Sequence, residues 1–138
     1  MNRDELQKLA MLRLRDAHVL LQAGQYEGAY YLTGYVVECG LKACIAKQVK
    51  RYDFPDKKSV ADSYTHDLNA LVKLAGLSSL HKTESTSNNA FNVNWTIIKD
   101  WSEIKRYSLS ISEVEATDLY SAVNARKNGI LSWLRRHW

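Results

Sequence analysis

The chain has 138 residues, a formal net charge of +4 and a pI near 9.1, with 46% hydrophobic and 25% charged residues. This length fits one domain, residues 1–138, and no apolar run approaches the ~20 residues of a membrane-spanning helix. The charged start of the chain also lacks the apolar core of a secretion signal, so we expect a cytoplasmic protein. The basic balance favours an acidic partner such as RNA.

The composition favours helices. One proline and six glycines leave long stretches unbroken. Residues 3 to 23 predict a first helix with a stripe of Leu and Ala on one side. Arg13 falls inside that stripe, either as a snorkelling side chain or as the buried partner of an acid on another helix. Gly24 ends the helix, and the short connection predicts that the second helix, roughly 26 to 51, is its antiparallel neighbour.

The second helix is apolar nearly all round, which is typical of a buried central helix. Between Gly28 and Ala46 its only charges are Glu38 and Lys42, spaced as i and i+4 so that they can pair. Because an unpaired buried charge is costly, we expect Glu38 to be buried and paired with Lys42, Arg13 or Arg106. Two cysteines on the same helix point away from each other and are expected to be buried thiols: Cys39 and Cys44.

The middle of the chain predicts one short helix between two loops. A proline and polar residues make 52–59 a loop. Thr65 can cap a short third helix that stops at Gly76. The polar stretch from Ser78 to Asn89 is the best candidate for a mobile loop.

Two further helices follow, about 90 to 105 and about 113 to 136. The last is opened by a capping box, Ser112 with Glu115. The expected fold is all-α, an up-and-down antiparallel bundle of four long helices plus one short helix. Trp95 and Trp101 fall on different sides of the 90–105 helix, so one core could not easily bury both. We therefore expect a second cover for this helix, most simply a two-fold homodimer.

Most standard catalytic motifs are missing from the sequence. It has no glycine-rich phosphate loop, no pair of histidines at metal-ligand spacing and no serine elbow. We therefore expect neither a metal site nor a cofactor. The four histidines are scattered and are expected to be surface or helix-end residues: His18, His66, His81 and His137.

Four stretches together resemble the HEPN family (higher eukaryote and prokaryote nucleotide-binding domains). They are Gly24–Gln25–Tyr26, the run from Ala29 to Lys42, Thr65–His66–Asp67–Leu68 followed by Leu71, and Arg106–Tyr107. The resemblance covers most of the chain, and its most specific parts are the Glu-x-x-Leu-Lys core and the His-Asp-Leu segment. It implies a helical bundle that commonly dimerises. Such domains are often encoded beside a minimal nucleotidyltransferase or act as RNA-cleaving toxins of toxin–antitoxin pairs.

Catalytic members of that family carry an arginine followed a few residues later by a histidine, near the start of a C-terminal helix. Here no histidine follows Arg106, and Ser112 cannot replace a group that titrates near neutral pH. Arg13 and His18 match the spacing on the wrong helix, where side chains five apart diverge. No catalytic residue is therefore predicted. The candidate nucleotide- or RNA-binding residues are Arg106, Tyr107, Lys42, Glu38, Tyr35 and Arg13.

Three functions remain open from the sequence. The first is a non-catalytic HEPN-like binding module that partners a separately encoded nucleotidyltransferase or binds nucleotide or RNA phosphate. The second is a metal-independent endoribonuclease with Arg106 as phosphate clamp and an unrecognised acid or base. The third is a purely structural dimeric scaffold, in which Glu38, Lys42 and Arg106 form an ion network inside the bundle.

Overall fold

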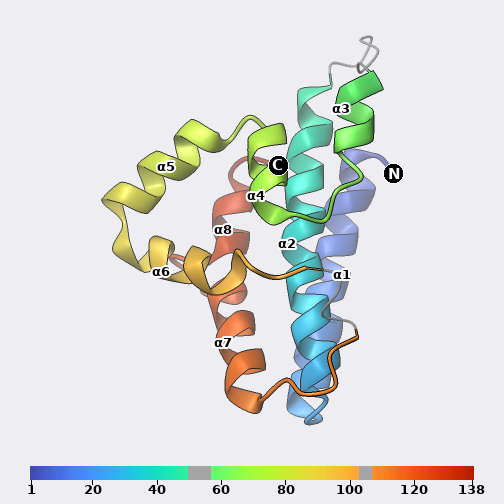
Figure 1. Cartoon of the computed structure of the whole chain (residues 1–138), viewed down its shortest axis with the longest axis vertical. Coiled ribbons are helices and arrows are strands. Elements are labelled where there is room, and N and C mark those ends of the chain that lie inside the picture. The colour runs from blue at the N-terminus through green and yellow to red at the C-terminus, as the bar shows by residue number, and fades with distance from the viewer. Residues whose placement is uncertain (50–56, 103–106) are drawn as a thin grey trace.

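The computed structural model describes residues 1–49, 57–102 and 107–138, and these residues form helices joined by turns (Figure 1). The all-α prediction is confirmed. The count of four long helices and one short helix is not, because the described residues contain two long helices and six shorter ones. In chain order they are α1 (Arg3–Gln22), α2 (Tyr26–Gln48), α3 (Lys57–Asp62), α4 (Leu68–Leu74), α5 (Ser78–Ser87), α6 (Asn89–Ile98), α7 (Glu113–Asn124) and α8 (Ile130–Arg135).

The first two helices form the predicted antiparallel hairpin. Asn2 and Glu5 cap the start of α1, each side chain accepting a hydrogen bond of 2.9 Å from the other residue's backbone N–H. The connection turns at Gly24, whose φ of +75° lies in the left-handed region that glycine adopts without strain. The glycine at this position explains why the connection between α1 and α2 could be predicted from the sequence.

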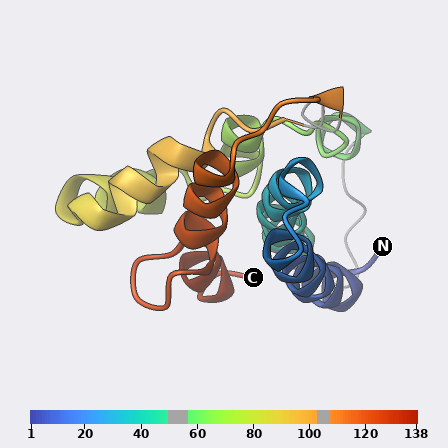
Figure 2. The ribbon, with the colours of Figure 1, turned by 90° about the horizontal axis from the view of Figure 1, so that it is seen from below.

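Helix α2 is the centre of the fold, with α1, α4, α7 and α8 all packed on it (Figure 2). Leu134 of α8 lies so close that a Cβ added at Gly40 would be 2.9 Å from its Cδ1. Both cysteines of α2 are buried free thiols, as expected. The prediction of a buried central helix is confirmed.

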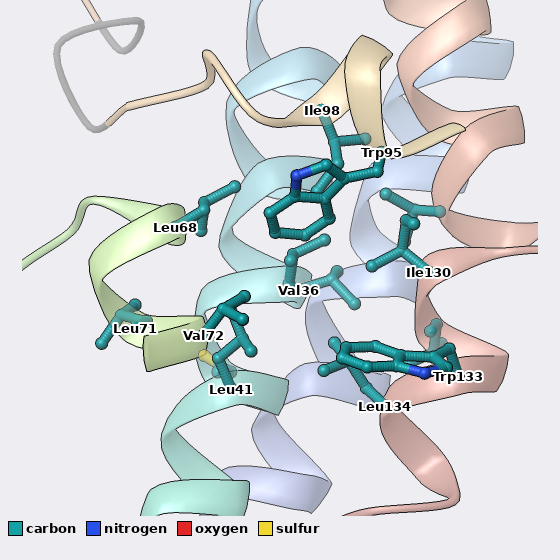
Figure 3. Packing of buried hydrophobic residues seen from close by; sticks show 14 of the residues in the cluster. Val36, Leu41, Leu68, Leu71, Val72, Trp95, Ile98, Ile130, Trp133 and Leu134 are labelled. Atoms are coloured by element: carbon teal, nitrogen blue, oxygen red, sulfur yellow. The ribbon is translucent and has the colours of Figure 1, made fainter. Parts of the chain in front are cut away.

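Between α2 and α7 the chain crosses over through α3 to α6 before returning to the hairpin (Figure 1). As a result α7 and α8 run in the same direction as α2, and both pack on it. The packing of these two helices on α2 is therefore parallel and does not follow the up-and-down alternation that we expected. Trp95 and Trp133 pack in the core together with side chains of α2 and α4 (Figure 3).

The stretch predicted as a mobile loop, 78–89, is instead largely helical. It forms α5, and its serine and threonine hydroxyls donate to carbonyls one turn back, from Thr86 to Lys82 at 2.7 Å and from Ser87 to Thr83 at 2.8 Å. His81 anchors the helix among the rings of Phe91, Trp95 and Trp133. Packing therefore overrides the weak helix propensity of a polar sequence.

The last helix is broken where we predicted continuity over 113–136. Helix α7 starts at the predicted Ser112 capping box but ends at Asn124, and α8 begins only at Ile130. Asn128, in the turn between them, accepts two hydrogen bonds from side chains. Asn88 Nδ2 donates to the Asn128 side-chain oxygen at 2.9 Å, and Asn94 Nδ2 donates to the Asn128 backbone oxygen at 2.9 Å. These long-range hydrogen bonds favour the break.

Three other boundaries differ from the predictions. Residues 57 to 59 of the expected 52–59 loop belong to α3, and α4 is capped by Asp67 rather than Thr65. Helix α4 does stop before Gly76, as predicted. Helix α2 ends at Gln48, with Val49 already extended, short of the expected end near residue 51. Residues 50–56, which include the rest of the expected 52–59 loop, lie outside the described residues.

Helix α6 ends at Ile98, well short of the predicted end at residue 105. Trp101 leaves the helix and lies over Gly34 of α2, where an added Cβ would overlap the indole. Trp101 is 2% exposed and Trp95 is 6% exposed, so one chain buries both rings. The expectation that one core could not easily bury both rings was therefore wrong, and the homodimer itself stays a prediction.

Among residues 1–49, 57–102 and 107–138, no helix combines the length and the hydropathy needed to cross a lipid bilayer.

Candidate functional site

A buried carboxylate and a half-buried histidine form the central pair of the candidate site. Glu38 on α2 is 1% exposed, and its Oε1 lies 2.5 Å from Nδ1 of His66. Its Oε2 lies 3.6 Å from Nζ of Lys42, close enough for an ion pair but too far for a hydrogen bond. The prediction that Glu38 is buried and paired with Lys42 is confirmed.

The other two predicted partners do not make this pair. Arg13 instead pairs with Asp16 on its own helix at 2.6 Å, and both side chains are partly exposed. Arg106 lies outside the described residues. Arg13 is still near enough for its positive charge to oppose the rise in the pKa of Tyr35.

His66 was missed at the sequence level, where it was expected to be a surface or helix-end residue. It lies in the turn before α4, which is fixed by two local hydrogen bonds. The Asp67 carboxylate accepts from the Ala70 N–H at 3.0 Å, and the Thr65 hydroxyl accepts from the Asp67 N–H at 3.2 Å. The sequence did contain one signal for a further partner of Glu38. A buried carboxylate needs more than one partner, and Lys42 is the only charged residue near Glu38 in the sequence.

The contact sets the chemistry of the imidazole. With Nδ1 directed at a carboxylate, the proton of a neutral ring belongs on Nδ1, and Nε2 is the free acceptor. In its protonated form the ring presents Nε2–H as a cationic donor. Within the described part of the chain Nε2 has no hydrogen-bond partner. His66 can therefore either accept a proton or bind an anion.

His66 opens on a polar cavity of about 470 Å³ between the start of α4 and the end of α6. The cavity contains one ammonium group, Lys99, and two carboxylates, of which Asp67 is already engaged at the α4 N-terminus. Its other described lining residues are Thr65, Asn69, Asp100, Trp101 and Ser102. The lining combines charged and hydrogen-bonding groups on one side of His66.

Aromatic rings form the wall between this cavity and α2. The Trp101 ring is stacked on Tyr31 at 5.9 Å between centroids and meets the edge of Tyr35 at 6.4 Å. Burial, and then the nearby Glu38 carboxylate, raise the pKa of Tyr35 above its ordinary value. The phenol therefore stays protonated at neutral pH and can donate a hydrogen bond.

A second cavity, of about 390 Å³, lies on the other side of the pair and is mostly apolar. Glu38 and Lys42 line it together with side chains of α1, α2 and α3, such as Leu9, Ile45 and Val60. His66 lines only the polar cavity, whereas Glu38 lines only the apolar one. The Glu38–His66 contact therefore joins the walls of two different cavities.

The predicted candidates are brought together only in part. Glu38, Lys42 and Tyr35 lie side by side on α2, where all three line the apolar cavity. Tyr107 is 69% exposed at the start of the last described stretch. Neither Arg13 nor Tyr107 lines the cavity on which His66 opens.

Comparison of the chain with protein-family models, curated proteins and solved structures found no match. The HEPN resemblance therefore rests on the residues that carry it in this sequence.

Proposed function

We propose that this chain is a HEPN-like helical binding module that holds the phosphate of a nucleotide or of RNA at His66. The single observation that carries the proposal is the 2.5 Å contact of His66 Nδ1 with the buried Glu38 carboxylate. The contact fixes Nδ1 of a ring that lines a polar cavity. The competing interpretation is a purely structural ion network of Glu38, Lys42 and His66.

Two features support a phosphate as the ligand. A protonated imidazole presents its Nε2–H as a charge-assisted donor for an anionic oxygen. Lys99 adds a second cationic side chain to the lining of the same cavity. Arg106 and Tyr107, which follow Ser102 in the chain, enter the proposal from the sequence alone.

Binding of AMP tests the proposal. We expect His66→Gln to weaken AMP binding at least tenfold, because the amide keeps the size of the ring but cannot carry a charge. His18→Gln is the matched control, since His18 is exposed and packs on Tyr120 rather than on Glu38. Equal affinity of the wild type and His66→Gln would leave only the structural interpretation.

We also propose that the module partners a separately encoded nucleotidyltransferase. The HEPN resemblance supports this partner, and the sequence lacks the carboxylate-bearing Gly-Ser signature of a polymerase-like transferase. The test is the gene neighbourhood followed by co-purification of the two products. A neighbouring transferase that elutes separately from this chain at micromolar concentration would contradict the partnership.

A second candidate function, a metal-independent endoribonuclease, is favoured by one specific observation. The sequence lacked a titrating group to accompany Arg106, and a carboxylate-oriented histidine is a suitable one. The 2′-oxygen of RNA would attack phosphorus while Nε2 of His66 takes its proton. The same nitrogen would then return a proton to the departing 5′-oxygen, leaving a 2′,3′-cyclic phosphate.

Incubating a mixed RNA pool with the protein in EDTA decides between binding and cleavage. Cleavage to cyclic phosphate ends that is lost in His66→Gln would favour the enzyme. Intact RNA together with His66-dependent binding would favour the non-catalytic module. Cleavage that persists in His66→Gln would rule out this histidine as the acid or base.

The homodimer is likewise a proposal. It is supported by exposed apolar side chains around the start of α7, where Leu109 is 93% and Val114 is 68% exposed. They follow closely on Arg106 in the chain, so a two-fold contact there would bring two copies of this segment together. Sedimentation should give a dimer for the wild type and a monomer for a Leu109→Asp, Val114→Asp variant. A wild-type monomer at high micromolar concentration would contradict the dimer.

A further inference from the structure

A cationic groove lies between α1 and the end of α8. It has a volume of about 630 Å³, and its charged lining residues, Lys8, Arg15 and Arg135, are all positive. Helices α1 and α8 flank one side of α2, whereas α4 and the His66 turn lie on the other side (Figure 2). The groove is therefore separate from the cavity on which His66 opens.

These three cations are not neutralised by neighbours. In the described ranges, none of them forms a salt bridge, whereas two other arginines nearby do, Arg13 with Asp16 and Arg136 with Glu84. The acidic residues at the start of α1 are Asp4 and Glu5, and Glu5 is engaged in the cap of that helix. The charged side chains that line the groove are thus all cations, and in the described ranges none of the three is held in a salt bridge.

The same groove contains an aromatic ring and an apolar floor. Trp138 is half-buried at its end, and Met11 and Leu12 are 40% and 42% exposed. The Arg3 guanidinium donates to the Trp138 backbone oxygen at 2.7 Å, which fixes the last turn of the chain against α1. The ring is thus held in place beside the cations.

Cations that line one groove together with an aromatic ring fit a single-stranded nucleic acid. Ammonium and guanidinium groups bind successive phosphates, while an unpaired base stacks on the indole. A double helix offers no free base faces to such a ring, and an acidic protein segment would leave the ring without a planar partner. The chemistry of the groove therefore favours a single strand over the other polyanions.

We propose that the α1–α8 groove binds single-stranded nucleic acid, with Lys8, Arg15 and Arg135 on phosphates and Trp138 stacked on a base. The proposal goes beyond the phosphate site at His66, because it assigns a separate surface on the other side of α2. A single strand bound here would be held independently of the groups that contact Glu38.

The first test is the affinity of a short labelled oligouridylate as a function of salt. We expect the triple variant Lys8→Gln, Arg15→Gln, Arg135→Gln to bind at least tenfold more weakly. Its log–log salt dependence should also be shallower, since each lost phosphate contact removes a slope of about 0.7. The matched control removes the same charge from exposed lysines elsewhere, Lys57→Gln, Lys58→Gln and Lys127→Gln, and should bind like the wild type.

The second test uses the indole itself. Trp95, Trp101 and Trp133 are 6%, 2% and 2% exposed, so quenching of tryptophan emission by the oligonucleotide should report Trp138. Trp138→Phe should remove the quenching and keep most of the affinity, whereas Trp138→Ala should lose both. An oligothymidylate of the same length distinguishes RNA from DNA as the preferred source, because only RNA offers 2′-hydroxyl groups.

Three results would overturn the assignment. The triple variant and its control could bind equally well, a duplex could bind as tightly as the single strand, or an acidic peptide could bind as tightly as the oligonucleotide. AMP binding at His66 should be unchanged in the triple variant. The groove can therefore fail while the proposed function stands, and the reverse outcome is equally visible.

Discussion

Nδ1 of His66 lies 2.5 Å from Oε1 of Glu38, although the two residues are 28 positions apart in the chain. The contact ties the turn before α4 to the middle of α2 and satisfies one oxygen of a carboxylate that is 1% exposed. Among the described residues the other oxygen has Lys42 as its one charged partner, at 3.6 Å. A group this buried and this sparingly paired makes both stability and chemistry sensitive to its neighbours.

Replacing Glu38 should destabilise the fold strongly. Removing one member of a buried ion pair typically costs about 3–5 kcal/mol, and Glu38→Ala also leaves a cavity beside Cys39. Urea denaturation gives the change in the free energy of unfolding. Asp118→Ala, which removes an exposed carboxylate from α7, should stay within about 0.5 kcal/mol of the wild type. Similar small effects for both variants would mean that the Glu38 contacts contribute little.

Gly34 should tolerate no larger residue while Trp101 is present. A Cβ at this position would overlap the indole, so Gly34→Ala must displace the ring at a cost of about 1–3 kcal/mol. In a Trp101→Ala background the same change should cost much less, because the obstruction is gone. The double-mutant cycle measures this coupling, and strictly additive free energies would show that the two residues are not in contact.

Acidification should destabilise the protein through His81. Burial among Phe91, Trp95 and Trp133 lowers the pKa of His81 below its ordinary value of 6.5. Between the folded pKa and 6.5 the unfolded chain binds more protons, so stability is full above this window and falls as the pH falls through it.

His81→Phe should therefore flatten the decline of Tm between about pH 7.5 and about pH 5.5. Burial lowers the pKa of His137 as well, so part of the decline should persist in this variant and disappear when His137→Phe is added. A slope that is unchanged in the double variant would contradict the assignment.

The two cysteines should be inert in the native protein. Burial raises the pKa of Cys39 to about 12, with a further contribution from the Glu38 carboxylate, and burial raises that of Cys44 to about 11. Because the thiolate is the reactive form, a disulfide reagent at about pH 8 should label neither residue without unfolding. Urea should release two reactive thiols at once. Rapid labelling of one thiol without urea would show that α2 is more open than its packing indicates.

The features that could be predicted from the sequence are those with local causes. The ends of the α1–α2 connection follow from Gly24, the start of α7 follows from the Ser112 capping box, and the burial of Glu38 follows from the apolar pattern of α2. Each depends on residues within a few positions of one another, where spacing alone determines geometry.

The features that could not be predicted depend on long-range contacts. The break after Asn124 depends on hydrogen bonds that Asn88 and Asn94 donate to Asn128, and the end of α6 depends on the fit of Trp101 over Gly34. The partner of Glu38 belongs to the same class. No sequence periodicity links His66 to a residue 28 positions away, so the contribution of His66 to the candidate site became visible only in the folded structure.

The most direct test of the central claim, that His66 held by Glu38 binds phosphate, is a long-range proton–nitrogen NMR spectrum of the histidine side chains recorded with increasing AMP. We predict that the Nε2 signal of His66 shifts saturably while its Nδ1 stays hydrogen-bonded, and that Glu38→Gln abolishes the response. A His66 signal that does not move while AMP shifts other histidines would contradict the claim.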